Sequence, residues 1–107
     1  MQLVFKALAD QSRRQLLDRL FEEQGQSLSA LCEGMGMRRQ SVSKHLAILE
    51  QSGLVAVQWR GREKLYYLNP VPIAEISERW LDKFSADKAV ALSRLKQALE
   101  DSEGESP

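Results

Sequence analysis

Apolar residues recur with the period of a helix over much of this chain, and the clearest stripe lies between residues 38 and 52. Val42, Leu46 and Leu49 fall on one face of the helix that this spacing predicts, and a core must cover that face. The other positions are mostly polar and begin with a basic, hydroxyl-rich turn. Gly53 follows as a helix stop. We therefore expect a helix that is held by its apolar back and presents a basic front.

Shorter stripes predict three helices before this segment, over about residues 3–9, 11–24 and 28–34. Asp10 and Ser27 suit the N-cap positions of the second and third helices, because their side-chain oxygens can accept a backbone N–H. A glycine-containing turn then joins the third helix to the basic helix, which predicts a helix-turn-helix unit. The residues expected to face inward are Leu16, Leu17, Leu20 and Phe21 of the second helix and Leu28, Leu31 and Cys32 of the third.

Two short segments after the basic helix have the pattern of strands. Residues 54–59 and 63–68 predict a β-hairpin whose turn, Arg60-Gly61-Arg62, is basic. We expect Trp59, at the end of the first strand, to contact the core. A helix-turn-helix followed by a basic hairpin is a winged helix-turn-helix. The fold class that we predict is therefore mainly α with a small β-hairpin.

The longest predicted helix runs over about residues 73–100. Its apolar stripe continues beyond what a small winged-helix core can cover, so we expect a partner surface there, most simply the same helix of a second subunit. Residues 1–100 are expected to form a single domain, and residues 101–107 an acidic, flexible tail. The chain is thus predicted to dimerise through a helix that takes little part in its own core.

The charges are unevenly placed, although the net charge is zero. Residues 38–69 hold six basic and two acidic side chains, whereas the segments on either side are net acidic. Such a local basic face favours double-stranded DNA as the partner. Arginine and lysine suit phosphates and guanine, and glutamine suits adenine. The candidate DNA-binding residues are Arg38, Arg39, Gln40, Ser41, Ser43, Lys44 and His45 on the basic helix and Arg60, Arg62 and Lys64 on the hairpin.

The sequence gives little support for other classes of protein. Without paired carboxylates, a nucleophile with a base or a glycine-rich phosphate loop, neither an enzyme nor a catalytic residue is predicted. No apolar run reaches the ~18 residues of a membrane span, and a signal-peptide pattern is absent, so we expect a cytoplasmic protein without membrane contact. Cys32 and His45 are the only cysteine and histidine, so neither a metal site nor a cofactor is predicted. Arg13 and Arg14 are expected on a solvated helix face or in an internal salt bridge.

Several motifs give the chain a resemblance to a known family. They are Ala7-Leu8-Ala9-Asp10 with Arg13-Arg14 and Leu16-Leu17, the segment from Ser41 to Leu49, Gly53-Leu54-Val55, Arg60-Gly61-Arg62 and Tyr66-Tyr67-Leu68-Asn69-Pro70. With these motifs the chain resembles the ArsR/SmtB family of bacterial winged-helix transcriptional regulators. The resemblance implies a homodimer that represses its own operon from an imperfect inverted repeat and pairs through its first and last helices. The residues implied at that interface are Leu3, Val4, Phe5, Leu8, Ile76, Trp80, Phe84, Leu92, Leu95 and Leu99.

Three departures limit what the resemblance implies. Arg38 stands where many members of the family begin the basic helix with serine, so a preferred N-cap is lost. Leu31-Cys32-Glu33-Gly34 has a single thiol where metal-sensing members have Leu-Cys-x-Cys. The last helix has no histidine to serve as a ligand. The metal-sensing chemistry of the family therefore does not carry over residue by residue.

Two other functions remain open beside a DNA-binding repressor. One is a thiol- or metal-responsive repressor that uses Cys32. The other is a winged-helix module that binds a protein in place of DNA. An unidentified small-molecule effector is also left open, since Trp80, Leu81 and Phe84 either line its pocket or pack between subunits.

Overall fold

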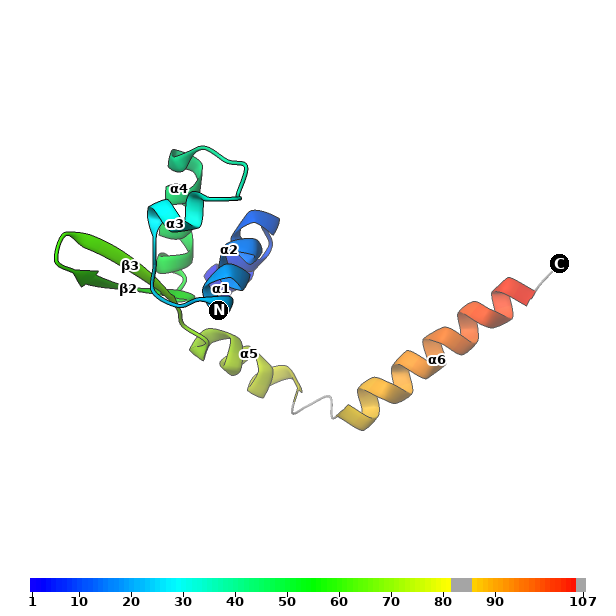
Figure 1. Ribbon diagram of the computed structural model, residues 1–107. Helices are drawn as coiled ribbons and strands as arrows, with labels where there is room; N and C mark the ends of the chain where they lie inside the picture. The colour runs from blue at the N-terminus through cyan, green and yellow to red at the C-terminus, as the bar shows by residue number, and fades with distance from the viewer. Residues whose placement is uncertain (82–85, 106–107) are drawn as a thin grey trace. The chain divides into compact units, whose positions relative to one another are not determined.

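The chain forms two compact units, residues 1–73 and 74–107, and the computed structural model describes residues 1–81 and 86–105 of them. Figure 1 shows the helices and strands in chain order. They are α1 (Gln2–Leu8), α2 (Gln11–Glu22), β1 (Gln26–Ser27), α3 (Leu28–Cys32), α4 (Arg39–Gln51), β2 (Val55–Arg60), β3 (Glu63–Leu68), α5 (Val71–Leu81) and α6 (Ala86–Glu105). The mainly α winged helix-turn-helix prediction is thereby confirmed. Within the described segments, no helix is long and apolar enough to span a bilayer.

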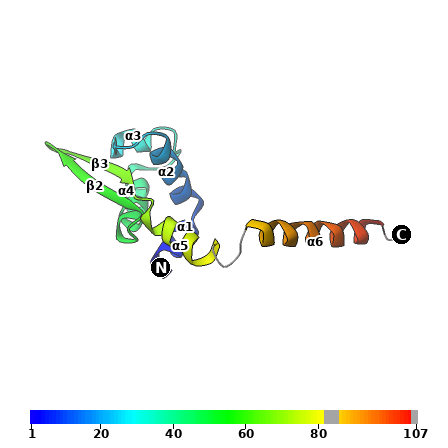
Figure 2. The same cartoon turned by 90° about the horizontal axis from the view of Figure 1, so that it is seen from below.

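The core of the first unit forms where α2, α3 and α4 meet beside the sheet (Figure 2). The apolar stripe predicted for α4 is buried completely and faces α2 and α3. Burying each leucine or valine contributes about 1.5–3 kcal/mol to folding, so this cluster fixes the position of α4. Its largest fully buried side chains are Leu16, Leu20, Leu31, Val42, Leu46, Leu49 and Leu54.

The sheet has a third strand that the sequence pattern did not predict. The order is β1-β3-β2, and β1 is only two residues long. Gln26 lies opposite Tyr66, and its buried side-chain amide donates to the carbonyls of Arg19 and Glu23 at 2.8 and 2.7 Å. Two residues carry no periodicity, so only the tertiary pairing reveals this strand. It covers the edge of β3 that β2 leaves free.

Both predicted N-caps are present. The carboxylate of Asp10 accepts the backbone N–H of Arg13 at 3.1 Å, and the hydroxyl of Ser27 accepts that of Ala30 at 3.2 Å. Arg38 caps α4 without any side-chain hydrogen bond, as its residue type predicted. The helix-turn-helix therefore has a capped α3 and an uncapped α4.

The C-terminal part differs from the single helix predicted over residues 73–100. It contains α5 and α6, and residues 82–85, including Phe84, lie outside the described residues. Helix α6 continues to Glu105, so most of the segment expected to form an acidic, flexible tail is helical, and its flexibility stays a prediction. Asp, Ser and Glu each lower helix stability only by tenths of a kcal/mol. No proline lies between Ala86 and Glu105 to end the helix.

Two aromatic side chains expected in the core are exposed. Phe21 is 75% exposed because it lies at the edge of the α2 stripe, about 140° around the helix from Leu16. Trp59 is 65% exposed because the far half of β2 extends beyond the helices that cover Val55. Both predictions rested on the local sequence pattern, which does not show how far the neighbouring elements cover each side chain.

Candidate nucleic-acid interface

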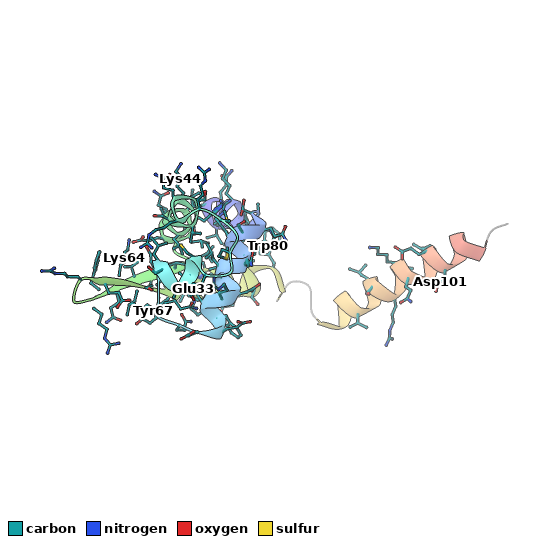
Figure 3. All side chains as sticks on the ribbon, turned by 45° about the horizontal axis from the view of Figure 1, so that its top comes forward. Glu33, Lys44, Lys64, Tyr67, Trp80 and Asp101 are labelled. Atoms are coloured by element: carbon teal, nitrogen blue, oxygen red, sulfur yellow. The ribbon has the colours of Figure 1, made fainter. Side chains whose placement is uncertain are left out.

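The first half of α4 presents its polar residues to solvent, opposite the buried stripe. Lys44 extends outward from the folded unit in Figure 3. Ser41 is half-buried and therefore less available than the exposed contact residues of this helix. The exposed candidates on this helix are Arg38, Arg39, Gln40, Ser43 and Lys44. A helix supported on one face and polar on the other has the form that fits a DNA major groove.

Ala47 is a further exposed residue on this surface of α4. It follows Ser43 and Lys44 by one helical turn, so the three side chains share one face. Ala47 is not among the predicted DNA-binding residues, because its side chain has no polar group. An exposed methyl at this position suits contact with the methyl group of thymine.

Arg39 contributes to the positioning of α4 as well as to its charge. Its Nη1 donates to the hydroxyl of Ser29 at 3.0 Å, which joins the first turn of α4 to α3. A guanidinium has five N–H donors, so Arg39 keeps donors for an anion. The side chain is exposed and remains available to one.

His45 is half-buried and hydrogen-bonded to α2. Its Nδ1 lies 3.3 Å from Nη1 of Arg13. A guanidinium can only donate, so Nδ1 is the acceptor and the neutral ring carries its proton on Nε2. The inward nitrogen of His45 is thus occupied within the protein, and only Nε2 is left to reach DNA.

Three arginines of α2 have roles that the sequence did not indicate. Arg13 donates to the carbonyls of Ala7 and Lys6 at 2.8 and 3.0 Å, and Arg14 donates to that of Leu8 at 2.7 Å. Neither arginine is in a salt bridge within the described part of the chain. The two guanidinium groups hydrogen-bond the last carbonyls of α1, of which that of Lys6 also accepts the backbone N–H of Ala9.

Arg19 donates hydrogen bonds to backbone carbonyls at the end of α3. Its Nη2 donates to the carbonyl of Ala30 at 2.8 Å, and its Nη1 donates to those of Leu31 and Glu33. These carbonyls lie where α3 passes into the turn before α4. Arg19 therefore holds the helix-turn-helix turn against α2. Its sequence neighbours give no sign of this contact, because the acceptors are backbone atoms at least eleven residues away.

The wing places two of its three predicted cations in solvent. Arg60 and Arg62 are exposed on either side of Gly61, whose positive φ of 65° suits the tight turn. Lys64 is half-buried, and its Nζ lies 3.5 Å from Oε2 of Glu50 at the end of α4. Lys64 thus joins the wing to α4, while the two arginines are unpaired among the described residues.

An open hollow of about 360 Å³ lies between the wing and the helix-turn-helix. Its basic residues come from both parts, so the front of α4 and the wing border the same space. It is lined by Ser27, Leu28, Ser29, Arg39, Trp59, Arg62, Glu63 and Lys64. Three cations and one anion give this hollow a net positive charge, which suits a phosphate backbone.

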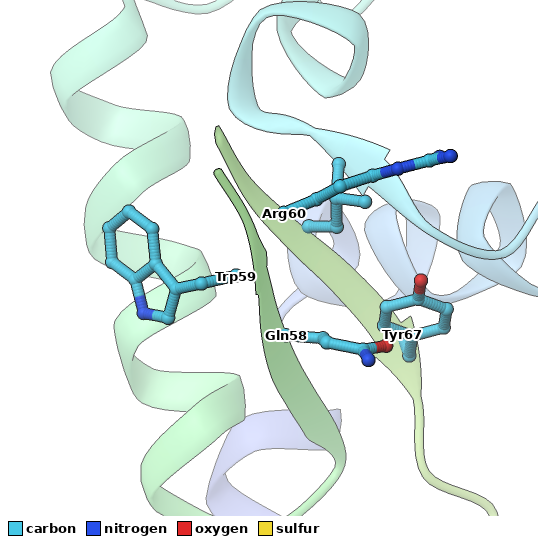
Figure 4. Close-up of a pocket in the computed structure, with 5 residues that line it drawn as sticks. Gln58, Trp59, Arg60 and Tyr67 are labelled. Atoms are coloured by element: carbon cyan, nitrogen blue, oxygen red, sulfur yellow. The ribbon is translucent and has the colours of Figure 1, made fainter. Parts of the chain in front are cut away.

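The other face of the wing carries a second, smaller hollow of about 250 Å³ (Figure 4). Gln58, Arg60 and Tyr67 lie on this side of the sheet, while the indole of Trp59 points to the opposite side. Alternation along a strand explains the division, since successive side chains point to opposite faces. The two faces of β2 are therefore chemically different. Trp59 and Leu65 complete the lining of the second hollow, and Trp59 also lines the first, toward which its indole points.

The N-cap residue Asp10 has a shifted pKa. The backbone N–H of Arg13, which hydrogen-bonds to the carboxylate, lowers the pKa of Asp10 below its ordinary 3.8. Partial burial opposes this shift, and the positive charge of Arg13 adds to it. The carboxylate is the better acceptor for the N-cap, so the folded state favours the ionised form.

The apolar residues implied at a dimer interface differ in how exposed they are. Val4 is only 7% exposed and packs in its own core together with Ala7, three positions on, so it offers little surface to a partner. Leu8 and Ile76 are half-buried, and Phe84 lies outside the described residues. The exposed candidates are Leu3, Phe5, Trp80, Leu92, Leu95 and Leu99.

An apolar hollow of about 380 Å³ continues the exposed surface of α1. It is lined by Leu8, Leu17, Phe21, Leu68 and Ile73 with Arg14 and Asp18 at its rim. All these residues belong to the first unit, so the hollow does not depend on the placement of α6.

Cys32 is a free, half-buried thiol. Within the described residues, no three His, Cys, Asp or Glu side chains are placed to hold a metal ion. The thiol- or metal-responsive alternative stays a prediction.

Comparisons with known proteins agree with this geometry. A family described as "Helix-turn-helix domain" matches residues 8–58. The transcriptional repressor SdpR of Bacillus subtilis is 33% identical over 83 residues, which are 76% of this chain and 88% of SdpR. The similarity includes the helix-turn-helix and the wing.

Solved structures extend the comparison. An ArsR-like transcriptional regulator from Rhodococcus sp. RHA1 has a TM-score of 0.68 and 32% identity, covering 91% of this chain and 90% of that one. The homodimeric winged helix-turn-helix DNA-binding domain of Mb0332 from Mycobacterium bovis has a TM-score of 0.62 and 27% identity. That match covers 90% of this chain and 82% of the other.

Proposed function

This chain belongs to the ArsR family of winged helix-turn-helix transcriptional regulators, and from that premise we propose that a homodimer binds an imperfect inverted repeat in double-stranded DNA and represses its own gene. The observation that carries the proposal is the basic, exposed front of α4 on a fully buried back, with a basic wing beside it.

The exposed residues divide into two roles by their chemistry. Gln40, Ser43 and Lys44 lie on the outer face of α4 and read base edges in the major groove. Ala47 continues that face and meets thymine methyl groups. The arginines that flank the helix and form the wing tip bind phosphates, which position the protein without reading sequence. They are Arg38, Arg39, Arg60 and Arg62.

A second subunit explains the apolar surface that one chain leaves open. Leu92, Leu95 and Leu99 form an exposed stripe on α6, and α1 exposes Leu3 and Phe5. The M. bovis neighbour is a homodimer, which supports the same assembly here. In a dimer two copies of α4 enter successive major grooves, with half-site centres ~34 Å apart.

Repression follows from occupancy of the promoter. The relative SdpR is a repressor, and the family resemblance supports binding next to the regulator's own gene. A dimer bound there excludes the transcription machinery without any catalytic step.

The decisive experiment is a fluorescence-anisotropy titration of the whole chain. The duplex from upstream of its own gene is compared with a scrambled duplex at several salt concentrations. We expect the upstream duplex to bind at least 1,000-fold more tightly, the lower end of usual specificity ratios, with one dimer per site. Equal, weak binding to both duplexes overturns the proposal of a self-regulating repressor.

A charge-reversal pair tests the face itself. Lys44→Glu with Arg62→Glu abolishes binding, whereas Lys6→Glu with Arg94→Glu, which has the same change in charge on exposed residues elsewhere, retains most of it. Retention of biological repression by the first pair would favour a protein-binding module. Equal losses for both pairs would mean that net charge, and not this face, governs affinity.

A further inference from the structure

Trp59 is a large apolar side chain in an unusual place. It is 65% exposed near the tip of the wing and stands opposite Lys64 in the antiparallel register. Paired residues of antiparallel strands share one face of the sheet, so the indole and the lysine lie on the same side. That side borders α3 and α4, while Gln58 points to the other side (Figure 4).

The hollow that Trp59 lines is basic and held in shape by two contacts. Arg39 is hydrogen-bonded to Ser29 across one wall, and Lys64, near the tip of the wing, is paired with Glu50 of α4. Arg62 enters from the wing tip, and Glu63 is the only acidic side chain in the lining. The indole therefore forms an apolar patch between fixed cations.

This combination matches one segment of a nucleic acid more closely than any other. A deoxyribose ring offers an apolar surface, and the phosphates on both sides of it accept hydrogen bonds. An indole has an apolar body with one N–H donor, so a single Trp can meet both. The neighbouring Arg39 and Arg62 neutralise the same phosphates, while Lys64 is paired with Glu50.

We propose that the hollow receives the sugar–phosphate backbone of one DNA strand beside the half-site. The ring of Trp59 lies against a deoxyribose, and its Nε1–H donates to a phosphate oxygen. This inference rests on the proposed DNA-binding function and adds a contact that carries no base recognition. Trp59 thus raises affinity for every sequence by the same factor.

Tryptophan fluorescence tests the contact directly, because the chain has only two tryptophans, Trp59 and Trp80. Trp80→Phe leaves Trp59 as the sole reporter, and Trp59→Phe leaves Trp80. We expect the upstream duplex to quench the emission of Trp59 and to shield it from acrylamide, with little change for Trp80. An equal response of both tryptophans would indicate a global change and overturn the inference.

Affinity gives an independent readout. Trp59→Ala weakens binding to the upstream and scrambled duplexes alike by about tenfold, ~1.4 kcal/mol. It leaves the salt dependence unchanged because no charge is removed, whereas Arg62→Ala removes one phosphate contact from each subunit and lowers the slope of the bound dimer by about 1.8. Gln58→Ala, on the opposite face of the same strand, is the matched control and leaves affinity unchanged.

The outcomes separate the two proposals. If the unaltered chain binds neither duplex, the DNA-binding function fails and this contact fails with it. If the chain binds DNA but Trp59 neither responds nor contributes to affinity, the contact alone is wrong. A loss confined to the upstream duplex would make Trp59 a base-reading residue and also overturn the backbone contact.

Discussion

Nη1 of Arg13 lies 3.3 Å from Nδ1 of His45, so one hydrogen bond joins the start of α2 to the middle of the DNA-facing helix α4. The same guanidinium donates to the carbonyls of Lys6 and Ala7 in α1. Three helices therefore meet at one half-buried side chain. Because α1 also belongs to the proposed dimer surface, Arg13 connects that surface to the helix proposed to read DNA.

Removing this side chain should destabilise the fold. Arg13→Ala leaves three acceptors without their donor, and hydrogen bonds to charged groups contribute about 1.5–3 kcal/mol each. With solvent entering the partly exposed site, we expect the free energy of unfolding to fall by about 2 kcal/mol in urea denaturation. Arg14→Ala, the exposed neighbour with one acceptor, should lower it by less than about 1 kcal/mol. Equal losses would contradict a special role for Arg13.

The lowered pKa of Asp10 predicts a pH dependence of stability. A carboxylate whose pKa is lower in the folded state stabilises the fold above its unfolded pKa, and this contribution is lost as the pH falls through the folded value. Asp10→Asn keeps an N-cap acceptor without titrating. The urea midpoints of the two proteins should differ by a constant amount above about pH 5. Below that, the unaltered protein should lose stability relative to the variant, and parallel curves down to pH 2 would show that the cap does not titrate.

Arg38 at the N-cap of α4 offers a gain in stability. Its backbone is extended, with φ −66° and ψ 148°, which suits a capping residue, yet its side chain makes no cap hydrogen bond. Arg38→Ser should raise the free energy of unfolding by about 1 kcal/mol. Arg38→Ala removes the same charge without adding a cap and is the control. Both variants should lower the salt slope of DNA binding by the dimer by about 1.8 if Arg38 of each subunit binds a phosphate.

The partners of Lys64 predict that it behaves differently from its neighbour on the wing. Its ammonium is 3.5 Å from Glu50 and 5.4 Å from the centre of the Tyr66 ring. We expect Lys64→Ala to change the salt slope of DNA binding by much less than the decrease of about 1.8 expected for Arg62→Ala in the dimer. A half-exposed pair of this kind contributes less than about 1 kcal/mol, so the fold should tolerate the change. Equal slopes for the two variants would restore Lys64 to the set of phosphate contacts.

The fold was predictable where local periodicity and tertiary packing agree. Val42, Leu46 and Leu49 define the buried face of α4 in the sequence and in the structure. The exposure of Trp59 was not predictable, because it depends on where the helices beneath the wing end. Arg19 was missed for a related reason: its acceptors are backbone carbonyls, which leave no trace in residue types. For the candidate site, the sequence indicated which residues are basic, and only the structure shows that Arg39 and Arg62 border one hollow.

The proposed dimer makes a final prediction about α6. Leu95 lies in the middle of an exposed stripe between Leu92 and Leu99, and a charge there would have to be buried in any interface through that stripe. Leu95→Glu should therefore give a monomer in sedimentation velocity at concentrations where the unaltered chain is a dimer. Affinity for the inverted repeat should fall by about 100-fold, because the second half-site is no longer bound intramolecularly.

Affinity of this variant for a single half-site should remain unchanged, since the first unit is not altered. Gln97→Glu introduces the same charge on the opposite side of α6, about 160° away by helical periodicity, and should leave the dimer intact. If Leu95→Glu sediments as a dimer and Leu3→Glu does not, subunit pairing proceeds through α1 alone. The apolar stripe of α6 would then need another explanation.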